Sequence, residues 1–551
     1  MNPLWRGKFT GIPLSTGGAG RSGTRRQDGG WRGPWIRPSL SRPMSRSEAN
    51  PPTPVTLDGS PLTTGEVVAV ARRHASVGLA DPARERVAAA RAVVATAADH
   101  VDPIYGLNTG FGSLSKVRIS VEQVHEIQRN IVRSHAAGVG DPLPPDVVRA
   151  TMLLLAASLA RGHSGVEPRT IDRLLWHLEH DVLPVVPSRG SVGASGDLAP
   201  LSHIALALIG EGSCLHRGTE QATGPLLEEL GERPLQLEAK EGLALLNGTH
   251  LMAATAALCL EDAATLVRAA IAGTALSVDA CRASHGPFDP RIHELRRQPG
   301  QAMVAREVLQ RLEGSTIVLD HLEDDPRVQD PYCLRASPQV LGAAIDAIDH
   351  VRTIVERELG AVTDNPLVMP EDGSILSGGN FHGMPLAIAL DSLRIALVHV
   401  AGIAERRVFW LLSGHDDQNP VTTYLAPEPG LHSGYMIAQY TAAACCNELQ
   451  TLANPASVGN VPTSAGIEDY NSMGATSANL ARQSIRLARD VVAIELLVMT
   501  EAMEHQRPLR SGTGVERTVE AVRGEVTPLT TDRPPAPDIA RIAELIAAGG
   551  V

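Results

Sequence analysis

The sequence is poor in aromatic residues and in cysteine. Only 3% of its 551 residues are Phe, Trp or Tyr, whereas 43% are hydrophobic. The core must therefore be aliphatic and rich in alanine, which favours closely packed helices. The six cysteines show no C-x-x-C spacing. This excludes the usual sequence signs of a disulfide framework or a zinc site, and is typical of the reducing cytoplasm.

Excess positive charge is also missing from most of the chain. The net charge is −12, and residues 1–46 hold nine basic residues against one acidic residue. The rest has 40 basic and 60 acidic side chains, a net charge of −20. Such an acidic body argues against nucleic acid as a partner. Residues 384–412 are long and apolar but contain both acidic and basic residues, so they predict a buried helix and no membrane partner.

The composition predicts four regions. Residues 1–54, rich in Gly, Pro, Ser and Arg, are expected to be a disordered basic tail, a targeting segment, or an extension upstream of a true start at Met44. Residues 55–250, with short helical patterns and glycine-rich turns, are predicted to form an N-terminal active-site region. Residues 251–510 are predicted to form a central helical bundle, and residues 511–551 a C-terminal tail with a short helix.

Long helical patterns dominate the second half. One apolar stripe recurs at intervals of three or four residues: Ile485, Ala488, Val492, Leu496 and Met499. Residues 251–280 are apolar nearly all round, which predicts burial on most faces. Strand-like alternation is scarce. The predicted fold class is therefore mainly α, a bundle of long helices completed by other subunits, with a smaller N-terminal region.

The segment Gly193-Ala194-Ser195-Gly196-Asp197 has the most specific chemistry. The amide nitrogen of Gly196 can attack the carbonyl carbon of Ala194, and loss of two waters then converts Ser195 into a dehydroalanine. The product is 4-methylidene-imidazol-5-one (MIO), an electrophile made from the chain itself. Ala194 leaves its carbonyl accessible, and Gly196 permits the backbone angles that the ring needs. The triplet alone is common, so its surroundings must decide.

Seven blocks accompany one another in a fixed order: IYGLNTGFGSL (104–114), QRNIVRSHAAGVG (128–140), ASG (194–196), KEGLALLNGT (240–249), QDPYCLRASPQVLG (329–342), DNP with SGGNFHG (364–383), and PTSAGIEDYNSMG (462–474). By these blocks the chain, from about Pro61 to Leu509, resembles the aromatic amino-acid ammonia-lyases, and among them most of all the histidine ammonia-lyases. The resemblance implies a fold of the ammonia-lyase and fumarase-like type. It also implies a cytoplasmic homotetramer with active sites shared between subunits.

The resemblance implies that an amino acid is the substrate and that MIO is the cofactor, with no metal and no diffusible cofactor. An electrophile helps because the β-hydrogen is barely acidic and the amine is a poor leaving group. Tyr105 matches the residue that takes the β-proton, although a phenol has an ordinary pKa of about 10 and needs assistance. Asn247 matches the residue that orients the MIO oxygen or the substrate amine. Tyr332 matches a residue that reaches the MIO.

Three further residues match positions that hold the substrate. Arg335 is a planar, bidentate donor suited to the substrate carboxylate. By resemblance, Gln329 and Phe381 line the pocket. No H-E-x-x-H pattern occurs among the 19 histidines, so no metal site is expected.

Two positions favour histidine as the substrate. Ser134-His135 is the pair that histidine lyases carry where tyrosine lyases have His-Leu and phenylalanine lyases have Phe-Leu. Glu468 matches an acidic residue of the histidine enzymes, where the phenylalanine enzymes have Gln. A carboxylate accepts an imidazole N–H and has no equivalent use on a phenyl ring. The resemblance therefore implies conversion of L-histidine to trans-urocanate and ammonia, as in histidine catabolism.

The block around Glu468 departs from the histidine-lyase pattern. Tyr470 stands where those enzymes have a histidine, Ile467 replaces a glutamine, and Asn471-Ser472 is similar to the phenylalanine enzymes. A tyrosine or phenylalanine ammonia-lyase, or an MIO-dependent aminomutase, is therefore the alternative. A more remote alternative is an inactive homologue that serves as a scaffold.

Overall fold

The computed structural model describes residues 52–98, 123–323 and 325–551. Residues 1–51 of the predicted tail and the predicted base Tyr105 lie outside the described residues. Residues 49–551 cluster into one compact unit, whose described part contains nineteen α-helices and only short strands. The predicted mainly α fold is confirmed. The regions 55–250, 251–510 and 511–551 stay a proposal about how this unit is organised.

The first part of the unit contains short helices and small sheets. Its helices are α1 (Thr64–Arg73), α2 (Asp81–Ala98), α3 (Val124–His135), α4 (Pro145–Leu159), α5 (Pro168–Glu179), α6 (Leu198–Leu208), α7 (Thr223–Glu229) and α8 (Glu241–Leu246). Its strands are β1 (Val55–Leu57), β2 (Val77–Leu79), β3 (Val139–Pro142), β4 (Leu183–Pro184), β5 (Pro187–Arg189), β6 (Ser213–His216) and β7 (Thr219–Ala222). β1 pairs with β2 in parallel, β3 pairs with β5 antiparallel, and β4, β6 and β7 form an antiparallel sheet.

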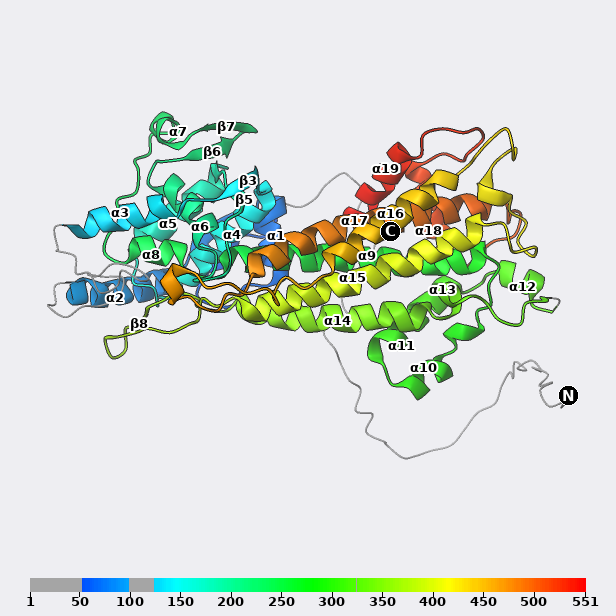
Figure 1. Ribbon diagram of the computed structural model, residues 1–551, viewed down its shortest axis with the longest axis horizontal. Helices are drawn as coiled ribbons and strands as arrows, with labels where there is room; N and C mark the ends of the chain where they lie inside the picture. Colours follow the sequence, from blue (N-terminus) through cyan, green and yellow to red (C-terminus); the bar gives the residue numbers. More distant parts are fainter. Residues whose placement is uncertain (1–51, 99–122, 324) are drawn as a thin grey trace. The chain divides into compact units, whose positions relative to one another are not determined.

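Five long helices run side by side as a bundle (Figure 1). They are α9 (His250–Ala280), α14 (Ser337–Glu358), α15 (Met384–Leu412), α16 (Met436–Leu452) and α17 (Gly474–Glu504). The predicted apolar stripe of α17 is buried along its whole length. α9 has 31 residues and is about 46 Å long, and its many alanines allow close packing against its neighbours.

Two helices of the described chain, α9 and α15, are long and apolar enough to cross a membrane. Of the most apolar 18-residue stretch in each helix, 83% is buried inside the protein in α9 and 67% in α15. Both also carry polar groups that are paired inside the bundle. The Arg407 guanidinium of α15 donates to Glu495 of α17 over 2.5 Å, and Ser277 of α9 donates to the same carboxylate. These contacts support a role as core helices, as the sequence predicted for residues 384–412.

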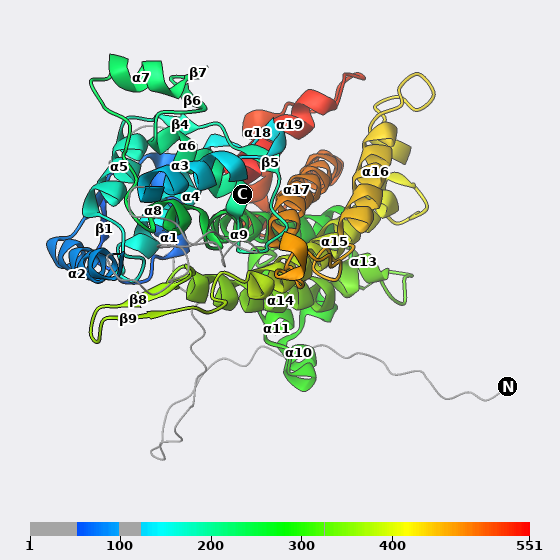
Figure 2. The same cartoon turned by 60° about the vertical axis from the view of Figure 1, so that its left-hand side comes forward.

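Shorter elements complete the unit. The remaining helices are α10 (Pro290–Arg296), α11 (Pro299–Arg311), α12 (Ile317–His321), α13 (Tyr332–Arg335), α18 (Thr513–Glu525) and α19 (Ala536–Ala547), with 3₁₀ turns η3 (Gly286–Phe288), η4 (Thr423–Leu425) and η5 (Ser464–Gly466). β8 (Leu367–Met369) and β9 (Ser374–Leu376) form an antiparallel hairpin. Figure 2 shows α16 at one side of the bundle, where it packs on α15 and α17.

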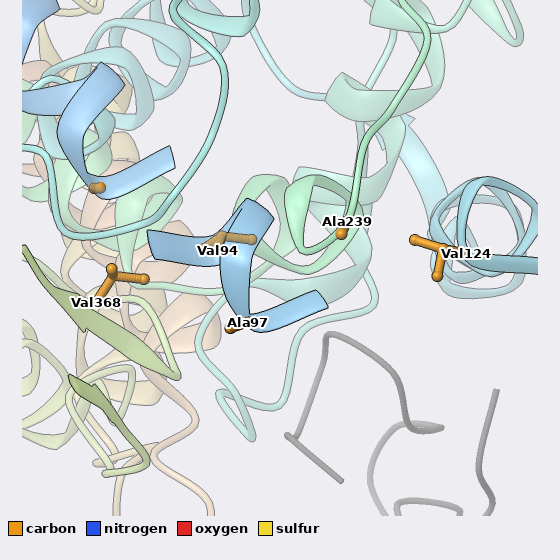
Figure 3. Packing of buried hydrophobic residues seen from close by; sticks show 6 residues of the cluster. Val94, Ala97, Val124, Ala239 and Val368 are labelled. Atoms are coloured by element: carbon orange, nitrogen blue, oxygen red, sulfur yellow. The ribbon is translucent and has the colours of Figure 1, made fainter. Parts of the chain in front are cut away.

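The hairpin is anchored to the first part of the unit. Val368 of β8 belongs to a buried cluster that includes Val94 and Ala97 of α2 (Figure 3). The backbone N–H of Val368 also donates to the carbonyl of His163 over 2.8 Å. This anchoring holds the segment just before β8, where Asp364 and Asn365 lie.

Candidate active site

The backbone around the Ala194-Ser195-Gly196 triplet has a path that only glycine allows. Gly196 has a φ of +77°, in the left-handed region. A Cβ built on it would lie 2.1 Å from the carbonyl oxygen of Gly248. Backbone hydrogen bonds join the triplet segment to Gly248: Gly248 N donates to Ser195 O over 3.2 Å, and Asp197 N donates to Gly248 O over 2.8 Å. The triplet therefore lies against the segment that follows α8, and its residues fit the predicted MIO ring.

Asp197 ties the triplet to the bundle. Its Oδ2 accepts from the backbone N–H groups of Leu251 and Met252, both over 3.0 Å, at the N-terminus of α9. Ser191 Oγ donates to its Oδ1 over 3.2 Å. Burial raises the pKa of Asp197 to about 7, although these hydrogen bonds oppose the shift. The sequence analysis assigned no role to Asp197. Its position directly after the triplet was the only feature of the sequence that could have indicated one.

Glu468 is brought next to Ser195 from 273 residues away in the sequence. Ser195 Oγ donates to Glu468 Oε1 over 3.4 Å, and Thr463 Oγ1 donates to the other carboxylate oxygen over 2.9 Å. Met473 N donates to Val192 O over 3.0 Å, which joins the Glu468 block to the triplet block. The structure thus places the predicted selectivity carboxylate at the predicted electrophile.

His135, at the C-terminal end of α3, lies close enough to Glu468 to interact with its charge. Burial lowers the pKa of His135, against the opposing effects of its hydrogen bond to Ile131 and the Glu468 charge. His135 Nδ1 lies 2.9 Å from the carbonyl oxygen of Ile131 and 3.0 Å from Ser134 Oγ. A carbonyl only accepts, so Nδ1 carries the proton and Nε2 is left as an acceptor. The predicted pair Ser134-His135 therefore belongs to the triplet end.

Asn247 lies at the C-terminal end of α8, one residue before Gly248. Its Nδ2 donates to Asp364 Oδ1 over 3.2 Å and to the carbonyl of Asn365 over 3.0 Å. Asp364 in turn pairs with Lys240 Nζ over 2.6 Å, and both side chains are buried. Lys240 and Asp364 were unassigned in the sequence analysis, although each lies in one of the seven blocks.

Phe381 lies in the turn that leads into α15, and it is half-buried. Nε2 of the neighbouring His382 lies 2.9 Å from the carbonyl oxygen of Tyr470. A Cβ added to Gly383 would meet Ser472 Oγ at 3.2 Å, and the same oxygen would meet a Cβ on Gly193. Phe381 is therefore carried on a segment that reaches the triplet end.

Gln329, Tyr332 and Arg335 lie together elsewhere. With Trp410 and His415 they line a cavity of about 550 Å³ around α13. Arg335 stacks on Tyr332, with the guanidinium carbon 4.4 Å from the ring centroid, and its Nε donates to Asp330 O over 2.9 Å. The Tyr332 side chain is exposed. These residues form a second polar group, well separated from the first.

Helix α14 runs between this second group and the triplet end. α14 begins two residues after Arg335 and ends at Glu358, which accepts a hydrogen bond from Thr249 beside Asn247. Its 22 residues span about 33 Å. In Figure 1, α13 and α8 lie toward opposite ends of the bundle. One chain therefore brings Ser134, His135, Asn247, Phe381 and Glu468 to the triplet end, and leaves Gln329, Tyr332 and Arg335 at the other.

Comparisons with known proteins agree with this architecture. A family model described as aromatic amino acid lyase matches residues 62–524. A histidine ammonia-lyase of Deinococcus radiodurans is 46% identical over 488 residues, which cover 89% of this chain and 93% of that relative. The crystal structure of histidine ammonia-lyase from Trypanosoma cruzi is similar, with a TM-score of 0.83 and 36% identity, over 90% of this chain and 94% of that one. A tyrosine aminomutase from Streptomyces globisporus has a TM-score of 0.85 and 36% identity, over 90% and 97%.

Proposed function

The chain belongs to the aromatic amino acid lyase family, and from this premise we propose that it removes ammonia from L-histidine to give trans-urocanate. The observation that carries the choice of substrate is the Glu468 carboxylate, 3.4 Å from the hydroxyl of Ser195. A substrate held at the triplet meets this carboxylate, which can accept the N–H of an imidazole ring. His135 adds a second acceptor beside it, through its free Nε2.

We propose that Ala194, Ser195 and Gly196 form MIO, without a metal or a diffusible cofactor. MIO supplies an electrophile that activates the amino acid for loss of ammonia. The backbone of Gly196 supports this proposal: its left-handed φ and the close approach of Gly248 require a glycine at the position whose amide nitrogen would close the ring. The bond from Gly248 N to Ser195 O and the anchoring of Asp197 hold the triplet in place.

The remaining roles follow the family resemblance. Arg335 binds the substrate carboxylate through its planar guanidinium, and Tyr105 takes the β-proton. Tyr332 reaches the MIO, and Gln329 and Phe381 line the substrate pocket. Because α14, about 33 Å long, separates Arg335 and Tyr332 from the triplet end within one chain, we propose that a second copy of the chain supplies them.

We therefore propose a homotetramer with active sites shared between subunits. Apolar side chains are exposed on the outer faces of the two bundle helices α15 and α16: Ile388, Ile395, Phe409, Ile437 and Tyr440. Apolar surface of this kind on a bundle is typical of a protein–protein interface. Covering it with other copies would bury these side chains. A cytoplasmic location is part of the same proposal and is supported by six free cysteines.

A product assay tests the substrate directly. The purified protein is incubated in parallel with histidine, tyrosine and phenylalanine, and the products are identified by mass spectrometry. We expect urocanate and ammonia from histidine. Coumarate or cinnamate without urocanate would overturn the choice of histidine.

An aminomutase is the second candidate. It is favoured by the similarity in fold to the tyrosine aminomutase from Streptomyces globisporus, at the same 36% identity as the histidine ammonia-lyase structure. An aminomutase returns the ammonia to the β-carbon, so a β-amino acid in the same assay would identify it.

A further inference from the structure

We propose that the buried ion pair Lys240–Asp364 orients the Asn247 side chain so that its oxygen accepts a hydrogen bond from the ammonium group of the substrate. This inference rests on the proposed function and deepens it. It assigns a positioning role to Lys240 and Asp364. It also chooses between the two roles predicted for Asn247, the MIO oxygen and the substrate amine.

The hydrogen bonds of Asn247 decide which way its amide points. Nδ2 has two protons, and it has two partners, Asp364 Oδ1 at 3.2 Å and Asn365 O at 3.0 Å. Both partners are acceptors. Turning the amide over would place Oδ1 against a carboxylate and a carbonyl, which repel it. The chemistry of the neighbours therefore determines the orientation.

Asp364 holds both ends of one short helix. Lys240 precedes α8 and Asn247 follows it, and the two side chains bond to different oxygens of the same carboxylate, Oδ2 and Oδ1. Lys240 has a φ of +71°, in the left-handed region that a lysine rarely occupies. Asn365 N donates to Asp364 Oδ1 over 2.6 Å and helps to fix the carboxylate. The packing of Val368 anchors the strand that follows Asp364 and Asn365.

A buried ion pair contributes little net stability, because both charges lose their hydration. Lys240 is fully buried and Asp364 is 3% exposed. A geometric role explains such a pair better than a stabilising role. With the lysine in place, Asp364 is a carboxylate that can only accept, so the neighbouring amide must present its N–H groups to it.

The acceptor left over is Asn247 Oδ1. It is buried and has no hydrogen-bond partner among the described residues. A buried acceptor without a donor is costly, so a donor on a ligand is favoured there. The ammonium group of an amino acid has N–H donors, whereas a ring carbonyl has none. Because Nδ2 is already occupied, Asn247 is suited to the substrate amine.

The test compares two ligands that differ only in the amine. Binding of L-histidine and of its deamino counterpart, 3-(imidazol-4-yl)propionate, is measured by calorimetry on the full-length Ser195→Ala protein, which prevents turnover. The readout is the ratio of the two affinities. In this background we expect Asn247→Ala to lower the ratio about 10- to 100-fold, the worth of one hydrogen bond to a charged group. Lys240→Met is expected to lower it about 3- to 10-fold.

Two further variants keep the test decisive. Lys240→Met/Asp364→Asn leaves no unpaired buried charge, so it is the variant to use if Lys240→Met fails to fold, and we expect the same fall in the ratio. Arg149→Met is the matched control, because it removes a buried cation of α4 that pairs with the more exposed Asp181. It is expected to lower stability and leave the ratio unchanged.

Equal weakening of both ligands by Asn247→Ala would overturn the acceptor role. An unchanged ratio in the folded Lys240 variants would overturn the role of the ion pair. If neither imidazole ligand binds, the proposed substrate has failed instead. The same comparison is then made with tyrosine and 3-(4-hydroxyphenyl)propionate, and a lower ratio in the variants would still support the inference.

Discussion

The triplet end and the α13 end of the bundle treat their polar side chains differently. Near the triplet, Asp197, Asn247 and Asp364 are each buried to more than nine-tenths and tied by several hydrogen bonds. Around α13, Tyr332 is 71% exposed and stacks mainly on Arg335. The first group is organised within one chain. The second is an exposed group, which in the proposed homotetramer would become part of a site when another subunit covers it.

Removing the Ser195 hydroxyl at the triplet end should cause the largest loss of activity. Ser195→Ala cannot lose water to form the dehydroalanine, so activity should fall by at least about a thousandfold. Product formation measures the loss, and intact mass spectrometry measures whether two waters have left the chain. Ser202→Ala, which removes a buried hydroxyl on α6, is the control and should retain activity. Wild-type activity in Ser195→Ala would refute the self-made electrophile.

A change at the α13 end should cost activity with little effect on folding. Arg335→Met removes the proposed carboxylate clamp and should lower kcat/KM about 100-fold or more. Its melting temperature should stay close to that of the wild type, because this side chain is only half-buried. A large loss of stability would mean that Arg335 acts on the fold.

Mixed tetramers test whether the triplet end of one subunit meets the α13 end of another. Ser195→Ala and Arg335→Met subunits, each expected to have strongly reduced activity alone, are co-expressed with different tags, and the mixed assemblies are purified. If each site takes its triplet from one chain and its arginine from another, about a quarter of the sites regain both residues. Activity should then return to about that fraction. No recovery would show that the two ends do not meet between subunits.

Substrate choice should respond to the carboxylate beside the triplet. Glu468→Gln keeps the shape but removes the charge, so kcat/KM for histidine should fall about 10-fold, and any turnover of phenylalanine should not. The neighbouring Asp469→Asn serves as the control, because Asp469 is an exposed acidic residue. Equal effects of the two substitutions would argue against a specific contact from Glu468 to the imidazole.

Buried histidines at the triplet end should make the fold sensitive to acid. Burial lowers the pKa of His250 to about 4, from an ordinary value of about 6.5. Between these values the unfolded chain binds the proton and the folded chain does not, so stability decreases as the pH falls from 6.5 to 4. This contribution reaches about 3 kcal/mol. Denaturant titrations at several pH values should show a weaker pH dependence in His250→Gln than in the wild type. The exposed His415→Gln at the α13 end should behave like the wild type.

Much of this molecule could be predicted from its residues. The family and the mainly α class are confirmed, because long apolar helices and ordered motif blocks are properties of contiguous sequence. The ion pair between Lys240 and Asp364 could not be predicted, since 124 residues separate the partners and neither charge has a distinctive local pattern. The bond from Ser195 to Glu468 joins residues 273 apart, and only the family resemblance placed them in one site.

The sequence by itself determined the seven ordered blocks, and with them the position of the proposed MIO triplet, Ala194-Ser195-Gly196. It also determined the helices, whose periodic apolar residues must be buried. Only the tertiary structure decided which way Asn247 points and which predicted site residues one chain can bring together. The physical reason is that hydrogen-bond direction and distance depend on neighbours in space. A rigid helix of about 33 Å, α14, keeps Arg335 away from Ser195 within one chain.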